Sequence, residues 1–180
     1  MEGESPAQAA VARGYSPQHL ARILQARGWL GPEPGPEVQA WLAEAAALLG
    51  PHAADDAALE ALLELVFRYD APAALALPES RTVFVRPGAR EVIRELAHLV
   101  LEGPEIDSDR FKHIITALKE ITGFGGQQLF YPVRLALAGR TGAGELDRVI
   151  LLIDRAARLP FPVAVKSARQ RMLEFCAALD

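Results

Sequence analysis

Glycine–proline pairs constrain the fold of this chain more than any other feature. Gly31-Pro32, Gly50-Pro51 and Gly103-Pro104 each join a residue with a permissive backbone to one that lacks a backbone N–H. Neither residue favours the interior of a helix. The segments between these breaks are rich in Ala and Leu, which are strong helix formers. The chain is therefore expected to fold into several short helices.

Apolar residues recur at helical spacing in these segments. The first stripe, formed by Leu20, Ile23 and Leu24, follows a Ser16-Pro17 pair that is typical of a helix start. Residues 1–15 are expected to form a frayed tail or a loosely docked short helix. We expect helices at about 18–27, 37–49, 56–69, 87–101, 109–122, 127–138, 145–158 and 163–179. The predicted fold class is all-α.

Residues 70–88 have a different texture. They contain three prolines and the β-branched run Thr82–Val85, so we expect an extended connector or a marginal edge strand there. Gly103-Pro104 is the preferred boundary between domains. The predicted organisation is two packed helical subdomains joined near residue 104. The first, 1–104, has proline-rich breaks and the extended connector at 70–88, and the second is 105–180.

Composition and cysteine content indicate the class of protein and its cellular compartment. Apolar residues make up 51% of the chain, which is ordinary for a globular protein. Cys176 is the single cysteine, so no internal disulfide can form. No apolar run reaches the ~18 residues of a membrane span, and the acidic start Met1–Ser5 lacks the order of a signal peptide. We expect a cytoplasmic protein without a membrane partner.

Charge is distributed unevenly along the chain. Residues 1–104 carry 8 Lys and Arg against 14 Asp and Glu, whereas residues 105–180 carry 11 against 9. A polyanion is therefore expected to prefer the second half. The excess of two positive charges is small, which argues against strong nonspecific binding of nucleic acid, because such binding depends on many phosphate contacts.

Residues for catalysis or metal binding do not assemble in the sequence. The four histidines are scattered and no pair has metal-ligand spacing on one helix. Asp107 and Asp109 are typical of a helix start, where carboxylates complement the dipole. We therefore expect neither a metal nor a cofactor, and we expect that the protein is not an enzyme.

One segment carries a family resemblance. Residues 129–139 read Leu-Phe-Tyr-Pro-Val-Arg-Leu-Ala-Leu-Ala-Gly. This resembles the pattern Leu-Phe-x-Pro-[Leu/Val]-Arg-x-Ala-Leu-[Thr/Ala]-Gly in the C-terminal helical domain of bacterial glutamyl-tRNA synthetases. Ser16–Trp29 and Leu59–Tyr69 are similar to earlier helices of that family. The resemblance implies an anticodon-binding domain. The family's His-x-Gly-His-type and Lys-Met-Ser-Lys-Ser-type catalytic motifs do not occur in this sequence, so it implies binding without aminoacylation.

The sequence also departs from the family pattern. After Gly139 the family often has Gly-Pro or Thr-Pro in a loop that approaches the anticodon, whereas this chain has no proline there and carries Glu145. The tail after Leu159 has no obvious counterpart. These departures leave room for a repurposed domain.

The candidate RNA contacts lie in the second half, and each has a structural alternative. The seven candidates are Arg134, Arg140, Thr141, Arg158, Lys166, Arg169 and Arg171. Arg134 suits either a phosphate or a carboxylate at a helix junction. The glycine-rich loop 139–144 suits either tRNA backbone or a plain turn. The basic residues of the last helix could equally form a solvated face. Phe124 and Tyr131 are candidates for base stacking, with core packing as the alternative.

The functional prediction is a non-catalytic tRNA-binding protein, with a tRNA of the glutamate type as its partner. Two alternatives stay open. One is a helical module that kept the fold, lost RNA binding and binds a protein instead. The other is an excised fragment of a longer synthetase.

Overall fold

The structure is a computed structural model that describes residues 15–180. Within these residues the chain forms helices and no strand, which confirms the all-α fold class. The expectation of a frayed tail or short helix at residues 1–15 falls outside the described residues, except for Tyr15, which is buried.

The helices follow one another with short connections. In chain order they are α2 (Pro17–Ala26), α3 (Pro36–Leu49), the 3₁₀ turn η1 (Gly50–His52), α4 (Asp56–Phe67), α5 (Ala71–Ala76), α6 (Pro78–Val85), α7 (Ala89–Glu102), α8 (Ser108–Thr122), α9 (Gln127–Ala138), α10 (Gly144–Ala157) and α11 (Ala168–Leu179). Most of these bounds lie within about two residues of those expected from the sequence.

Side-chain caps explain where several helices begin. Ser16, Asp55, Asp107 and Ser167 each precede a helix and accept a hydrogen bond from a backbone N–H of its first turn. These bonds satisfy donors that have no partner inside the helix. The cap at Ser167 also shows that the last helix begins at Ala168, five residues later than expected. Pro160 and Pro162 belong to the connection before it.

The prediction of an extended connector or edge strand at residues 70–88 is wrong. This segment forms the two short helices α5 and α6. Pro72 and Pro78 lie in the first turns of these helices, where a missing N–H costs nothing. Asp70 caps α5 by accepting from Ala73 N–H. The β-branched run is helical because tertiary packing overrides its propensity: Val83 is buried in the core.

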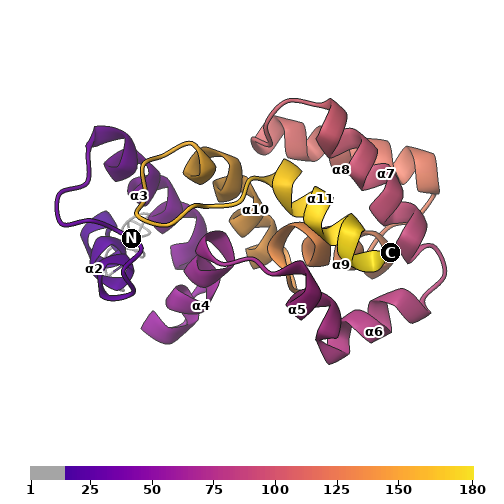
Figure 1. Ribbon diagram of the computed structural model, residues 1–180, viewed down its shortest axis with the longest axis horizontal. Coiled ribbons are helices and arrows are strands. Elements are labelled where there is room, and N and C mark those ends of the chain that lie inside the picture. Colours follow the sequence, from indigo (N-terminus) through magenta and orange to yellow (C-terminus); the bar gives the residue numbers. More distant parts are fainter. Residues whose placement is uncertain (1–14) are drawn as a thin grey trace, which may run out of the picture.

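The molecule is elongated, with helix groups at its two ends (Figure 1). Helices α2, α3 and α4 form one end, and α5 to α9 together with α11 form the other. Helix α10 joins the two groups, because it packs against α3 and α4 on one side and against α9 and α11 on the other. The buried apolar residues form a single core cluster along the whole molecule.

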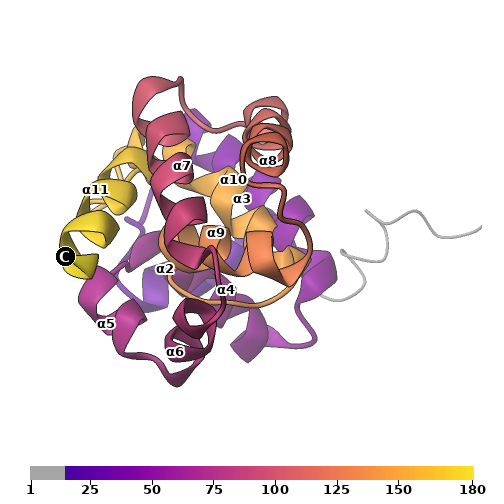
Figure 2. The same ribbon diagram turned by 90° about the vertical axis from the view of Figure 1, so that its right-hand side faces the viewer.

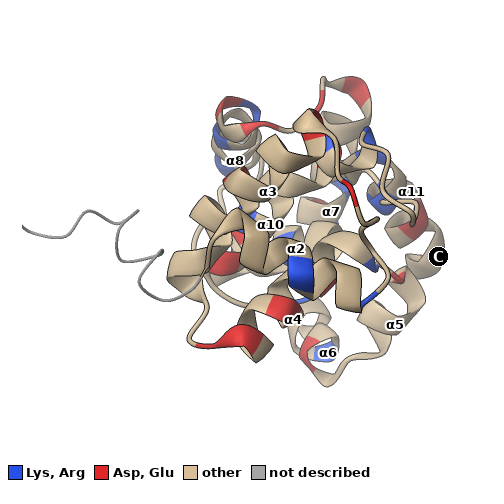
Figure 3. Ribbon diagram, turned by 90° about the vertical axis from the view of Figure 1, so that its left-hand side faces the viewer, with Lys and Arg blue, Asp and Glu red and all other residues tan. Residues whose placement is uncertain are grey.

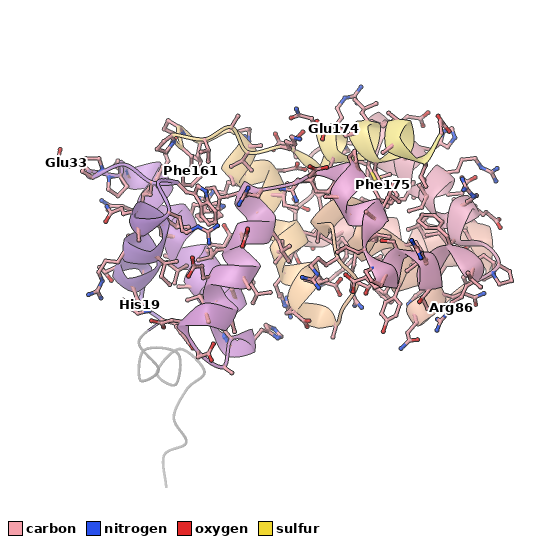
Figure 4. All side chains as sticks on the ribbon, turned by 60° about the horizontal axis from the view of Figure 1, so that its bottom comes forward. His19, Glu33, Arg86, Phe161, Glu174 and Phe175 are labelled. Atoms are coloured by element: carbon pink, nitrogen blue, oxygen red, sulfur yellow. The ribbon has the colours of Figure 1, made fainter. Side chains whose placement is uncertain are left out.

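Aromatic side chains fill the core between α3, α4 and the segment before α11. Phe67 stacks on Trp29, with ring centres 5.2 Å apart, and meets Phe161 edge to face at 5.0 Å. Phe161 points inward between the helices in Figure 4. Trp41 contacts both phenylalanines and donates from its indole nitrogen to the Leu152 carbonyl at 3.1 Å. The connection after α10 is thereby fixed to the N-terminal helices.

The turn at Gly103-Pro104 lies between helices that pack on each other, α7 and α8. The buried carboxylate of Asp154 accepts from Ile106 N–H at 2.7 Å and from Ala168 N–H at 2.8 Å. It therefore ties the turn and the start of α11 to α10. Because helices on both sides of residue 104 contribute to one core, the division into subdomains at this residue stays a prediction.

None of the helices within residues 15–180 is long and apolar enough to cross a membrane.

Candidate nucleic-acid interface

A groove of about 1050 Å³ opens where the end of α4, helix α5 and the connection from α9 to α10 meet. The segment after α4 contributes Arg68 and Tyr69, and the α9–α10 connection contributes Arg140 and Thr141. Lys166, just before α11, lies on the same groove. Three segments that are distant in sequence therefore form its walls.

The α9–α10 connection, residues 139–143, starts at a glycine that the backbone requires. Gly139 ends α9 with φ of 81°, a left-handed conformation that residues with a Cβ rarely adopt. The chain then turns so that Arg140 Nε lies 3.3 Å from a carboxylate oxygen of Glu79, and the Thr141 hydroxyl donates to the other oxygen at 2.8 Å. Glu79 of α6 thus holds both polar side chains at the edge of the groove.

Arg134 of α9 also holds the α9–α10 connection in place. Its guanidinium donates to both carboxylate oxygens of Asp147, at 2.8 and 2.9 Å, and to the Gly142 carbonyl at 2.7 Å. It also lies over the Phe130 ring, 4.8 Å from its centre. Only 11% of its side chain is exposed. The structure thus pairs Arg134 with a carboxylate at a helix junction, which is the structural alternative considered for it.

Arg171 is completely buried beneath the groove. It donates to the carbonyls of Leu65 and Val66 at the end of α4, to Leu137 at the end of α9, and to Lys166, at distances from 2.7 to 3.0 Å. Helix C-termini carry partial negative charge, so they suit a cation. Arg171 therefore fastens together the three segments that form the groove.

The expectation that Arg171 lies on an exposed face with Lys166 and Arg169 is wrong. Its four carbonyl partners enclose the guanidinium, so no phosphate can reach it in this fold. Burial lowers the pKa of the guanidinium to about 10. Burial likewise raises the pKa of the neighbouring Tyr69 phenol above its usual range. Both groups are part of the core that supports the groove.

Lys166 reaches the groove from the segment before α11, not from the helix itself as expected. Its ammonium group donates to the Tyr69 carbonyl at 3.0 Å and to a Glu174 carboxylate oxygen at 2.8 Å. The side chain is 33% exposed. It can therefore contact a ligand in the groove while keeping its internal partners.

Arg158 and Arg169 line a separate pocket of about 350 Å³ that shares no residue with the groove. The Arg158 guanidinium pairs with Glu105 at 3.1 Å, and Arg169 donates to the Leu101 carbonyl. Of the seven predicted contacts, the structure thus brings Arg140, Thr141 and Lys166 together on one groove. It places Arg158 and Arg169 elsewhere, and Arg134 and Arg171 in supporting positions.

Two groove residues were missed by the sequence analysis. Arg68 follows α4, and 66% of its side chain is exposed. The exposed His52 also lines the groove. Arg68 directly follows α4, and the apolar pattern of that helix does not mark it as a binding residue. The sequence around it contains no motif that would have singled it out. Phe124 and Tyr131, by contrast, are partly buried and pack against the core.

The groove itself is close to neutral. Its basic side chains are Arg68, Arg140 and Lys166, and its carboxylates are Glu64, Asp70 and Glu145. The end of the molecule formed by α2, α3 and α4 is more acidic (Figure 3). Within residues 15–67 the chain has two arginines against seven carboxylate side chains. A polyanion approaching the groove would therefore meet repulsion on that side.

Histidine, cysteine and carboxylate side chains do not gather into a metal-binding group of three or more within residues 15–180. The expectation that the protein uses no metal stays a prediction.

Comparison with known proteins identifies the family. The sequence model of the anticodon binding domain family matches residues 19–159, which is well over half of the chain. The chain belongs to the anticodon binding domain family. The match includes α9, the α9–α10 connection and Arg68, so most of the groove lies within the family region. It confirms the resemblance drawn from residues 129–139.

The similar curated proteins are glutamate–tRNA ligases. The chain is 37% identical to glutamate–tRNA ligase 2 of Syntrophus aciditrophicus over 92 residues. The matched residues make up 51% of this chain and 18% of that ligase. It is 30% identical to the glutamate–tRNA ligases of Bacillus licheniformis and Bacillus subtilis over 73% of its length. The chain spans 27% of the length of each of these two proteins. No solved structure matches it.

Proposed function

We propose that this chain is a non-catalytic tRNA-binding unit that accepts the anticodon arm of a glutamate-type tRNA in the groove between α4, α5 and the α9–α10 connection. The observation that carries the proposal is the position of Arg140 and Thr141. They directly follow the helix of the family pattern and lie on the edge of a groove that is large for a ligand site, at about 1050 Å³.

The side chains of the groove favour recognition of unpaired bases. Arg68 and His52 are exposed and planar, and such groups stack on splayed bases in RNA-binding proteins. Thr141 has a hydroxyl that can donate to a base edge in place of Glu79. The balance of three basic and three acidic groups provides little long-range attraction. Affinity is therefore expected to come from stacking and hydrogen bonds more than from phosphate contacts.

Family membership supports the proposal, and so do the names of the relatives. Each ligase named above acts on glutamate and tRNA, and this chain matches their anticodon-binding part. The two Bacillus ligases are nearly four times as long as the part this chain spans. Aminoacylation is accordingly left out of the proposed activity.

A titration of labelled glutamate tRNA at two salt concentrations tests the proposal. With three basic side chains at the groove, the logarithm of the association constant should fall with the logarithm of salt with a slope of about −2. The double variant Arg68→Ala/Arg140→Ala should weaken binding about tenfold or more. The matched variant Arg22→Ala/Arg94→Ala removes the same charge from α2 and α7 and should bind as the wild type does.

Equal, weak binding of glutamate tRNA and of an unrelated RNA of the same length would overturn the proposal. So would equal losses in the two double variants, because that result would trace binding to net charge instead of the groove.

A further inference from the structure

A second groove runs between α7 and α11, which lie side by side near the C-terminal end of the molecule (Figure 2). Its volume is about 370 Å³. The two helices are antiparallel, since Arg169 at the start of α11 donates to the carbonyl of Leu101 near the end of α7. The groove shares no residue with the proposed tRNA site.

The floor of this groove is apolar. It is formed by Ile93, Ala97 and Leu101 of α7 and by Leu179 of α11, with Cys176 beside them. The apolar surface continues along α11, because Leu173 precedes Cys176 by three residues and is 51% exposed. Exposed apolar side chains beside an apolar groove are typical of a protein-binding surface.

One rim of the groove is a basic row. Arg90, Arg94 and His98 are exposed and follow each other at intervals of four residues, so they lie along one face of α7. Arg90 has no carboxylate within 4.0 Å in the described part of the chain, and Arg94 has only Glu95 at 3.5 Å. Arg86, four residues before Arg90, lies outside α7 and is not part of this row, because its guanidinium donates to the Gln127 side chain of α9 at 3.3 Å.

We propose that the α7–α11 groove docks an amphipathic helix of a partner protein, with an apolar face and a row of acidic residues along one flank. The apolar face fills the floor, and the acidic row meets Arg90, Arg94 and His98. Residues 90–101 rise about 17 Å, so the groove accommodates about three turns of helix. The partner's acidic residues would then recur every four positions.

The apolar floor favours a protein helix over RNA. Nucleic acid is held by basic and polar surfaces, and an apolar floor leaves its phosphates without partners. A helix with acidic and apolar faces satisfies both parts of the groove at once. Glu102 lies 3.9 Å from the His98 ring at one end of the row, so Arg90 and Arg94 are the main groups that the partner's carboxylates meet.

A synthetic helical peptide provides the probe. It has three turns, Leu on one face and Glu at every fourth position on the flank, and its control has Lys in place of each Glu. Fluorescence anisotropy with the full chain should detect saturable binding of the Glu peptide and binding at least about tenfold weaker of the Lys peptide. The Glu peptide should also slow alkylation of Cys176.

Three variants assign the binding to the groove. Arg90→Glu/Arg94→Glu and Leu179→Asp should each weaken binding of the Glu peptide by about tenfold or more. Arg22→Glu/Arg140→Glu makes the same change in net charge outside this groove, touches the proposed tRNA site, and should leave peptide binding intact. Circular dichroism melts confirm that each variant is folded.

Several results would overturn the proposal. Equal binding of both peptides, or none of either, would do so, as would binding that survives Arg90→Glu/Arg94→Glu. Dimerisation of the chain that Leu179→Asp abolishes would assign the groove to a second copy instead. Loss of tRNA affinity in Arg90→Glu/Arg94→Glu would assign the α7–α11 groove to RNA. The peptide test does not bear on the proposed tRNA groove, because the two grooves share no residue.

Discussion

The guanidinium of Arg171 lies over the ring of Tyr69, 4.8 Å from its centre, and the Tyr69 hydroxyl donates to the Arg171 carbonyl at 3.3 Å. The same hydroxyl donates to the Ala136 carbonyl at 2.6 Å. These two residues, 102 positions apart, join the ends of α4, α9 and the start of α11 beneath the proposed tRNA groove. The shape of the groove therefore depends on residues that a ligand does not touch.

Arg171→Lys should destabilise the fold by about 2–4 kcal/mol, measured by urea denaturation. Lysine keeps the charge, but its single ammonium group cannot reach carbonyls from α4, α9 and residue 166 together. Arg169→Lys, on the same helix but exposed, should change the free energy of unfolding by no more than about 0.5 kcal/mol. Similar effects of the two substitutions would contradict the supporting role of Arg171.

Tyr69→Phe should cost about 1–2 kcal/mol near neutral pH, because two buried carbonyls lose a donor. Burial raises the Tyr69 pKa, so the unfolded state ionises first as the pH rises. The stability that this phenol confers is then fully present below the unfolded pKa of about 10 and declines at higher pH. Urea melts of wild type and variant should converge above about pH 10. A constant difference up to about pH 11 would contradict the assigned burial.

Arg134→Ala should weaken tRNA binding without removing a contact to RNA. Its bonds to Asp147 and Gly142 hold the α9–α10 connection in place, so the connection should move and the amides of residues 140–144 should exchange hydrogen faster. Asp147→Ala, which removes the same ion pair from the other side, should reproduce both effects. A loss of affinity with unchanged hydrogen exchange would instead place Arg134 in direct contact with the RNA.

Cys176 should react slowly with iodoacetamide. Burial raises the pKa of its thiol, so less thiolate is present near pH 8 than in glutathione. Denaturation in urea should remove the difference. A native reaction rate equal to that of glutathione would contradict the position of Cys176 at the side of the α7–α11 groove.

The sequence predicts the helices well because they carry apolar stripes at helical spacing, and α2, α4, α8 and α11 also follow a Ser or Asp cap. The prediction for residues 70–88 was wrong because their prolines were interpreted as breaks. Pro72 and Pro78 instead lie in the first turns of α5 and α6. No local signal shows that Val83 packs into the core and keeps Thr82–Val85 helical.

The site was predicted less completely, since it depends on which helix faces are buried. Arg171 was treated as exposed, although Ala168, Met172 and Phe175 form a stripe at helical spacing that includes it. That stripe was the available signal.

Averaging charge over half the chain hid a second feature. The acidic total of residues 1–104 concealed the basic row of Arg90, Arg94 and His98, whose four-residue spacing is visible in the sequence. Which segments meet at the proposed tRNA groove depends on tertiary contacts, such as those of Glu79 with Arg140 and Thr141, that no local pattern contains.

Titration of an isolated anticodon stem-loop of glutamate tRNA, compared with the same stem carrying a changed anticodon, tests the central claim most directly. The account predicts saturable binding that prefers the native anticodon and that Arg68→Ala/Arg140→Ala weakens about tenfold while Arg22→Ala/Arg94→Ala leaves it unchanged. Equal affinity for both stem-loops, unaffected by Arg68→Ala/Arg140→Ala, would contradict it.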